Sequence, residues 1–195
     1  MANKVFNMAG GSHSAAAYSA FEDAMYGSCV ASETDYSISS VTGMNVTLST
    51  GYGLISTGSG YARRIGSDAT NTITIAAASA SNPRKDAIIA YIDMSVSPTT
   101  SVTDNTNGIL KFTSVAGSPS ATPAAPSASA ISNAIGAGNP YVILYYVNVP
   151  ANATSLNASN IDDNRKIASQ PEGPTITSGS AAPSGGNDGD IYIQY

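Results

Sequence analysis

Charge is scarce in this 195-residue chain: only 11% of its residues are charged, less than half of the roughly 25% that is usual in soluble domains. Eight Lys and Arg residues against 13 Asp and Glu residues give a formal net charge of −5. No basic cluster is larger than two adjacent residues, whereas nucleic-acid binding needs a dense basic footprint to neutralise phosphates. The composition therefore argues against nucleic acid as a partner and predicts a polar, nearly uncharged surface.

Residues that carry chemistry are also scarce, with one Cys, one His and no Trp. Cys29 cannot form an internal disulfide, and no metal-type Cys/His cluster accompanies it. His13 lies in a Gly-Gly-Ser-His-Ser stretch with no carboxylate or cysteine close in sequence, and no Gly-x-Ser-x-Gly nucleophile motif is present. We expect no catalytic residue, no metal site and no cofactor.

Long apolar runs are missing as well. Residues 1–11 lack the apolar core of a signal peptide, and no stretch approaches the roughly 18 apolar residues of a membrane span. We therefore expect a protein that is made and folded in the cytoplasm and has no membrane partner. The chain nevertheless contains 42% apolar residues, which is enough for one ordinary domain with its own core.

Residues 14–28 have the pattern of a short helix. Ser14 is suited to the N-cap, and Gly27 to the left-handed position just after the last turn. The apolar residues on one face are Ala17, Tyr18, Phe21, Ala24 and Met25, at helical spacing. Glu22 and Asp23 are expected on the opposite, solvent side. So short a helix needs a partner surface, provided by the domain's own sheet or by another subunit.

From about residue 34 the period of the apolar residues changes to two, as in Met44, Val46 and Leu48. The predicted strands that follow are Tyr61–Ile65, Thr72–Ala76, Ala87–Met94, Leu110–Val115 and Tyr141–Val149. Short strands separated by polar turns indicate an antiparallel β-sandwich or barrel. The runs 87–92 and 141–146 are apolar on both faces, so we expect these two strands to be central and covered on both sides.

The connection between these two central strands contains Gly117–Pro126, which is rich in proline and cannot continue a ladder. Residues 127–134 follow it, with Ser127 as a possible cap and Ile131 and Ile135 four residues apart. This segment is a short helix or a plain loop.

The C-terminal part changes in composition. Residues 169–189 are rich in Pro, Gly, Ser and Ala and are typical of a linker. The chain then ends in Ile191-Tyr192-Ile193, a strand pattern with no apolar partner of its own, so we expect it to add to an existing sheet edge in this or a neighbouring subunit. Three regions follow: an N-terminal arm with the helix (1–33), a β-sandwich (34–168), and a linker with a terminal strand (169–195).

The few charges gather at the ends of the buried segments. They are Arg84, Asp86 and Asp93 around one strand, and Asp162, Asp163 and Arg165 after the other. Arginine can hold a carboxylate by two parallel hydrogen bonds, which fixes register. Either at least one ion pair links the 84–93 strand to the 162–165 segment, or these are solvated charges that contribute little.

The order of these elements resembles a module of phage and prophage structural proteins. The elements are a Gly-rich hairpin, Asn82-Pro83-Arg84-Lys85-Asp86 with its hydrophobic strand, a Pro-Ala-Ala-Pro stretch, the strand 141–149, and Asp163-Asn164-Arg165. The likeness covers roughly residues 40–166. This part of the chain is similar to N-terminal domains of tail and baseplate proteins, which mount receptor-binding or fibre parts on siphophages of Gram-positive hosts. The last residues, 189–195, resemble the end strands of phage fibre and collar-type proteins.

This resemblance implies a β-sandwich that oligomerises, usually as a homotrimer, and attaches to other virion proteins of a tail, baseplate, collar or head fibre. On this interpretation Tyr18, Phe21 and Met25 of the helix and Ile191, Tyr192 and Ile193 of the terminal strand serve assembly. An alternative is a receptor-binding module for a host cell-surface saccharide. Its contacts would come from exposed tyrosines, namely Tyr18, Tyr26, Tyr36, Tyr52 and Tyr61, although such residues are more simply core or interface residues.

Overall fold

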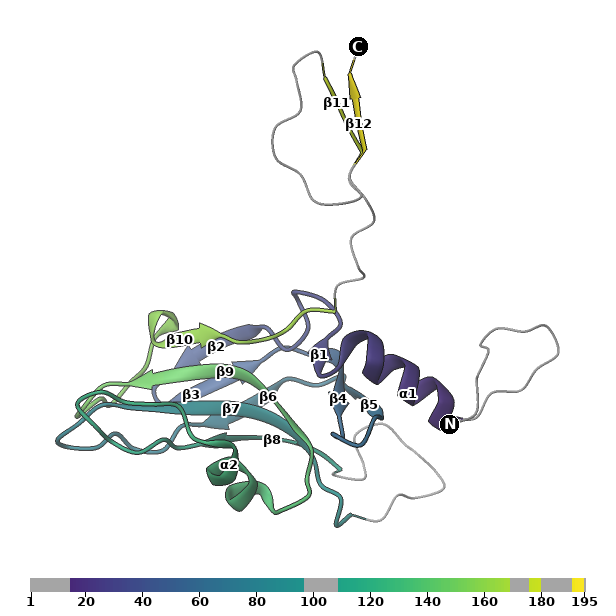
Figure 1. Ribbon diagram of the computed structural model, residues 1–195. Helices are drawn as coiled ribbons and strands as arrows, with labels where there is room; N and C mark the ends of the chain where they lie inside the picture. The colour runs from purple at the N-terminus through teal and green to yellow at the C-terminus, as the bar shows by residue number, and fades with distance from the viewer. Residues whose placement is uncertain (1–14, 97–108, 169–175, 180–190, 195) are drawn as a thin grey trace.

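The computed structural model describes residues 15–96, 109–168, 176–179 and 191–194, and within them the chain is mainly β (Figure 1). The helices are α1 (Ala15–Tyr26) and α2 (Ala128–Ile135), with a 3-10 turn, η1, at Ala158–Asn160. The strands are β1 (Cys29–Val30), β2 (Ile38–Thr42), β3 (Asn45–Leu48), β4 (Gly51–Ser56), β5 (Ala62–Ser67), β6 (Asn71–Thr74), β7 (Arg84–Ile92), β8 (Leu110–Val115), β9 (Tyr141–Val149), β10 (Ile161–Asp163), β11 (Ile176–Gly179) and β12 (Ile191–Gln194).

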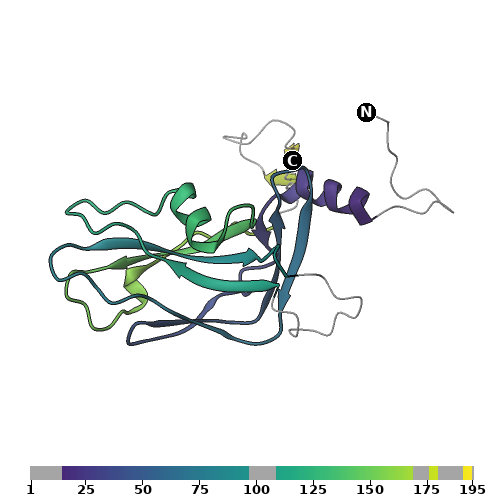
Figure 2. The same cartoon turned by 90° about the horizontal axis from the view of Figure 1, so that it is seen from below.

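The described body is an antiparallel β-sandwich with a short N-terminal helix, which confirms the predicted fold class. One layer is the sheet β10-β9-β7-β8, and the facing layer is β2-β3-β6. Only two residues separate β3 from β4, and three separate β5 from β6, so the sheet β1-β4-β5 continues the second layer after a bend. In Figure 2 the hairpin β4–β5 stands across one end of the sandwich, beside α1. No closed barrel forms within the described residues.

The two strands expected at the centre do lie there, because β7 and β9 pair with each other along their length and each has a second neighbour. Alternate residues of β7 face opposite sides. Ile88 and Ala90 join the main core between the two layers, whereas Ala87 and Ile89 join a second cluster with Ile131 of α2. The two strands are therefore covered on both faces, as their unbroken apolar runs predict.

Local sequence signals explain both helix boundaries. Gly27 has φ +61° and its N–H donates to the carbonyl of Asp23 at 3.0 Å, which ends α1 in the left-handed conformation that glycine adopts without strain. Ser14, the expected N-cap, lies outside the described residues. In α2 the Ser127 side chain accepts a hydrogen bond from the N–H of Ala130, so 127–134 is a capped helix and not a plain loop.

The expected domain limits differ from the pairing of the strands at both ends. Strand β1 lies in the range assigned to the N-terminal arm, yet it pairs with β4, so the β-region begins at Cys29. Strand β11 lies in the range assigned to the linker and pairs in parallel with β12. The terminal strand was expected to add to a sheet edge in this or a neighbouring subunit; it pairs within its own chain, with β11, in a separate two-stranded sheet. Strand β11 was not predicted, because its four residues contain one large apolar side chain, Ile176, and so show no alternation.

Candidate functional site

Helix α1 packs on the hairpin β4–β5 through polar contacts. The hydroxyl of Ser19 donates to the carbonyl of Ala62, and Arg64 of β5 donates to the Glu22 carboxylate from Nε at 2.8 Å. At the end of the helix, Lys166 Nζ donates to the carbonyl of Tyr26 at 2.9 Å. The helix therefore uses its own sheet as the partner surface that its length requires.

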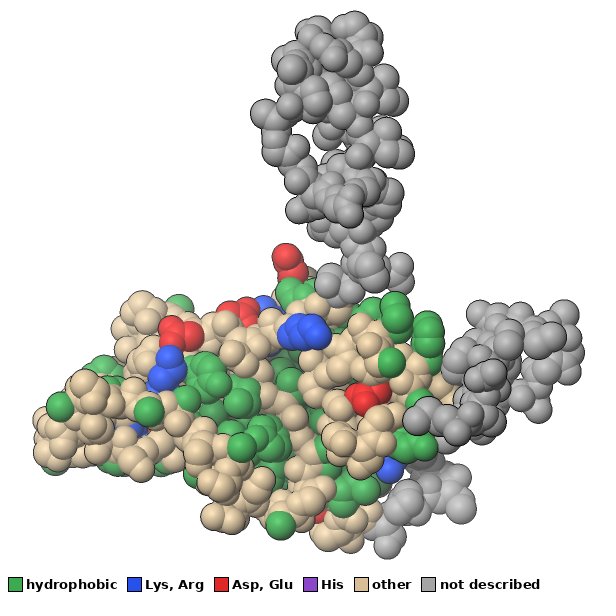
Figure 3. Space-filling view, viewed as in Figure 1, with side chains coloured by type: hydrophobic (Ala, Val, Ile, Leu, Met, Phe, Trp, Pro, Cys, Tyr) green, Lys and Arg blue, Asp and Glu red, His purple; other side chains and the backbone are tan. Residues whose placement is uncertain are grey.

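This orientation leaves the three large apolar residues of one helix face on the surface, whereas Ala17 is buried. Tyr18, Phe21 and Met25 are 42%, 47% and 44% exposed, respectively, and in Figure 3 hydrophobic side chains lie on the surface over α1. We call these three residues the α1 stripe. The expectation that Glu22 and Asp23 face solvent was wrong: the Glu22 side chain is only 19% exposed, and Asp23 Oδ1 is buried. The physical reason is Arg64, which draws Glu22 onto the sheet.

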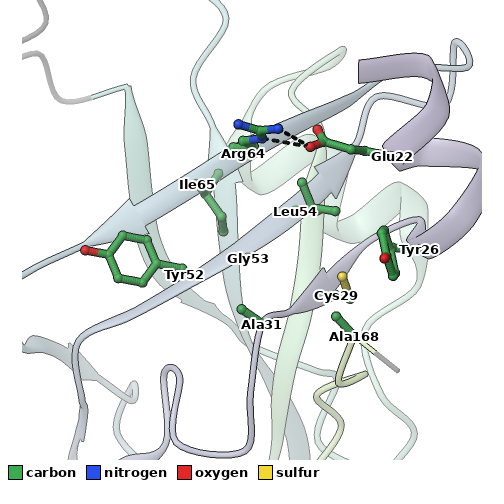
Figure 4. A pocket seen from close by; sticks show the side chains of 10 residues that line it. All are labelled: Glu22, Tyr26, Cys29, Ala31, Tyr52, Gly53, Leu54, Arg64, Ile65 and Ala168. Atoms are coloured by element: carbon green, nitrogen blue, oxygen red, sulfur yellow. Dashed lines mark hydrogen bonds and ion pairs between the residues drawn. The ribbon is translucent and has the colours of Figure 1, made fainter. Parts of the chain in front are cut away.

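A shallow open groove of about 270 Å³ lies where α1 meets the hairpin (Figure 4). Tyr52 stands at one end of the groove, and Tyr26 and Glu22 from α1 stand at the other. The lining is mostly apolar and consists of Glu22, Tyr26, Cys29, Ala31, Tyr52, Gly53, Leu54, Arg64, Ile65 and Ala168. No sequence motif marks this groove, because its lining comes from α1, three strands and the segment after β10.

Tyr52 is held flat at the end of the groove. It pairs across the hairpin with Gly66, where an added Cβ would lie only 2.8 Å from Tyr52 Cδ1. Its ring therefore rests on the Gly66 backbone while 62% of the residue stays exposed. Of the other tyrosines considered for saccharide contacts, Tyr18 and Tyr61 are exposed and Tyr26 is half-buried, but Tyr36 is fully buried in the core.

The groove offers little chemistry. Cys29 is its one nucleophile, and burial raises the pKa of this thiol, which keeps it protonated and unreactive. The Glu22 carboxylate already forms an ion pair with Arg64. Within the described ranges no group of three His, Cys, Asp or Glu side chains is placed as metal ligands would be. His13 lies outside those ranges. No described helix has the length and apolar character that a membrane crossing needs.

Arg84 and Asp86 form a buried ion pair within β7, with Arg84 Nε 2.9 Å from Asp86 Oδ1. Arg84 also donates to the carbonyls of Ala76 and Ala77, and Asp86 Oδ1 accepts from the N–H of Gly117 at 3.0 Å. The pair therefore fastens two loops onto β7. Both side chains are almost fully buried and hydrogen-bonded, the condition under which a buried pair is tolerated.

Arg165 and Asp163 form a second pair, with Arg165 Nη2 2.7 Å from Asp163 Oδ2. The other terminal nitrogen of the guanidinium, Nη1, donates to the carbonyls of Glu33 and Asp35 at 2.8 and 2.7 Å. The guanidinium also lies 5.3 Å from the centre of the Tyr145 ring. Arg165 thus ties the segment after β10 to the loop after β1.

An ion pair does link the 84–93 strand to the 162–165 segment, but Lys85 and not an arginine makes it. Lys85 Nζ lies 3.0 Å from Asp162 Oδ2, and its ammonium also lies 5.0 Å from the centre of the Tyr146 ring. Asp93 pairs with Lys111 across the β7–β8 edge at 2.6 Å. Arg84 and Arg165 instead pair with carboxylates two residues away, because alternate residues of an extended chain share a face.

These partners predict how stability depends on pH. The hydrogen bond from Lys111 lowers the pKa of Asp93 to about 2, and hydrogen bonds from Lys85 and Arg165 lower the pKa values of Asp162 and Asp163. The unfolded chain, whose carboxyl pKa is near 3.8, therefore binds protons first as the pH falls. We expect the thermal unfolding midpoint to be highest above about pH 5 and to fall progressively down to about pH 2.

The contribution of Asp93 is separable by mutation. In Lys111→Met the pKa of Asp93 returns towards its ordinary value, so the fall of the midpoint between these pH values should be shallower. Lys166→Met is the matched control, because it removes the same charge but its ammonium contacts a carbonyl and not a carboxylate. Equal pH profiles for the two variants would contradict the assignment.

No protein-family model, curated protein or solved structure matches this chain.

Proposed function

We propose that this chain is a non-enzymatic structural protein of a bacteriophage virion, an adaptor that oligomerises and attaches to neighbouring virion proteins. The observation that carries the proposal is the α1 stripe. Tyr18, Phe21 and Met25 lie on the exposed side of a helix whose other side is held to the hairpin by Ser19 and Glu22. A contiguous apolar surface rimmed by polar residues is typical of a protein interaction site.

The spacing within the α1 stripe suits a second helix. Residues 18, 21 and 25 are separated by three and four positions, which is the spacing of residues that pack between neighbouring helices. Identical stripes on symmetry-related copies can cover one another around a common axis. The proposed oligomer is a homotrimer, as the resemblance in the sequence implies, assembled in the host cytoplasm and carried in the virion.

The sparse charge of the surface supports the same proposal. The charged side chains visible in Figure 3 are few, and most of the described surface in that view is polar and neutral or apolar. Such a surface is covered by a neighbouring subunit at a low desolvation cost, because burying an unpaired charge is far more costly than burying a hydroxyl. A tightly packed assembly of copies and neighbours gains from this composition.

Saccharide binding is the second candidate function, and Tyr52 is the observation that favours it. Its ring rests on Gly66, is open to solvent, and lies in the same groove as the hydrogen-bonding pair Glu22 and Arg64. A flat aromatic face beside charged donors and acceptors suits a sugar ring. Binding on a glycan array that Tyr52→Ala abolishes would favour this function over assembly.

Light scattering on the purified chain tests the assembly proposal. We expect a mass near three times the 19.6 kDa of one chain. The double variant Phe21→Gln, Met25→Gln should sediment and scatter as a monomer, because both substitutions keep a good helix former but remove the apolar side chains.

Met94→Gln is the control, since Met94 is 51% exposed but is not part of α1. It should leave the mass unchanged. A monomeric wild-type chain at high concentration, or an oligomer that survives the double substitution, would overturn the proposal.

A further inference from the structure

The first strand of the sandwich, β1, lies beside the segment that follows β10. Val30 of β1 and Ile167 form a parallel bridge. The N–H of Val30 donates to the carbonyl of Lys166 at 2.8 Å, and the N–H of Ala168 donates to the carbonyl of Val30 at 2.7 Å. Figure 4 shows Cys29 and Ala168 together at the edge of the groove. We call this pairing of residues 29–30 with 166–168 the terminal bridge.

The β1 strand of the terminal bridge is buried, whereas Lys166 on the other strand is exposed. Val30 is 1% exposed and belongs to the main core, and the half-buried Ile167 packs against the same core. Burial on the side of Val30 strengthens the backbone hydrogen bonds of this residue electrostatically. The side chain of Lys166 adds a third link by donating to the carbonyl of Tyr26, the last residue of α1.

The segment behind the bridge is anchored independently. Arg165 holds the carbonyls of Glu33 and Asp35 with one nitrogen and Asp163 with the others, and its side chain is only 8% exposed. Arg165 therefore also joins the loop that follows β1 to the segment that precedes the bridge residues 166–168. Neither strand of the bridge can slide without breaking this anchor.

We propose that the terminal bridge is a mechanical clamp that resists tension applied between the two ends of the chain. Because its strands are parallel, a pull on the chain before Cys29 and after Ala168 drives them past each other along their length. This shear loads both backbone hydrogen bonds and the Arg165 anchor together, whereas a pull across the strands would break them one at a time. The inference rests on the proposed function, in which an adaptor transmits load between virion parts.

Single-molecule force spectroscopy on the full chain tests the clamp. The chain is stretched from its two termini or, in a second version, from cysteines placed at Tyr61 and Met94, two exposed positions between which no clamp residue lies. Cys29 is buried and does not compete for the handles. We expect a higher unfolding force from the termini than from the internal pair.

Ala168→Pro removes the N–H of residue 168, which donates to the carbonyl of Val30 in the terminal bridge. It should lower the force measured from the termini and leave the force measured from residues 61 and 94 unchanged. An equal fall in both geometries would mean that Ala168 is merely structural, and no fall in either would mean that the bridge bears no load; both results overturn the clamp. Light scattering on the same variant reports assembly separately, since the α1 stripe is intact.

Discussion

Asp86→Ala should destabilise the protein by about 3–5 kcal/mol, because it leaves the guanidinium of Arg84 buried without its carboxylate. Arg84 is 5% exposed and Asp86 is not exposed at all, so water cannot replace the missing partner. The substitution also removes the acceptor for the N–H of Gly117. The free energy of unfolding from urea denaturation measures the loss.

The neighbouring pair supplies the control. Lys85 stands beside Asp86 on β7, but its partner Asp162 is half exposed, so Asp162→Ala should barely move the denaturation midpoint. A double variant, Arg84→Met with Asp86→Leu, should recover part of the loss, because replacing both members of a buried pair removes the uncompensated charge. If Asp86→Ala costs no more than Asp162→Ala, the buried pair does not stabilise the fold.

Gly117→Ala should destabilise the protein by about 2–3 kcal/mol through overpacking. A Cβ at this position would lie 2.2 Å from the carbonyl oxygen of Lys85 and 3.0 Å from that of Ala124. Both obstacles are backbone atoms, so relief requires a shift of the chain at the point where Gly117 donates to Asp86. Thermal and urea unfolding should both report the loss.

Gly66→Ala is the matched substitution on the hairpin. Its added Cβ would meet only ring carbons of Tyr52, an exposed side chain that can rotate away. Alanine also restricts the unfolded chain more than glycine does, which offsets part of the cost of moving the ring. We therefore expect the free energy of unfolding to change by less than about 1 kcal/mol. Equal effects of the two substitutions would show that the close approach of Gly117 to Lys85 is not what constrains this loop.

Asp86 and Gly117 belong to the scaffold on which the position of the α1 stripe depends. Helix α1 is oriented by Arg64 on β5, and β4–β5 is part of a layer that packs on β7 and β9. Asp86 and Gly117 lie at the other end of this sandwich and do not contact α1. Their variants should therefore lower stability but leave the mass of the assembly unchanged when light scattering is measured below the melting temperature.

The sequence by itself determined the periodic elements of this protein. Alternation of apolar and polar residues predicted the β-fold, and unbroken apolar runs predicted β7 and β9 as the covered central pair. Gly27 and Ser127 predicted a helix end and a helix start. Each of these signals is local, since the period of side-chain directions and the backbone freedom of glycine act over a few residues.

Only the tertiary structure decided which partner each surface meets. The sequence singled out Arg84 and Arg165 as the cations of the ion pairs, yet Lys85 links β7 to the segment after β9, because register and strand pleat select the facing atoms. The amphipathic pattern of α1 was evident, but Arg64, 42 residues from Glu22, turns its polar side inward. A residue pattern specifies which side chains share a face, and contacts between distant segments decide what that face touches.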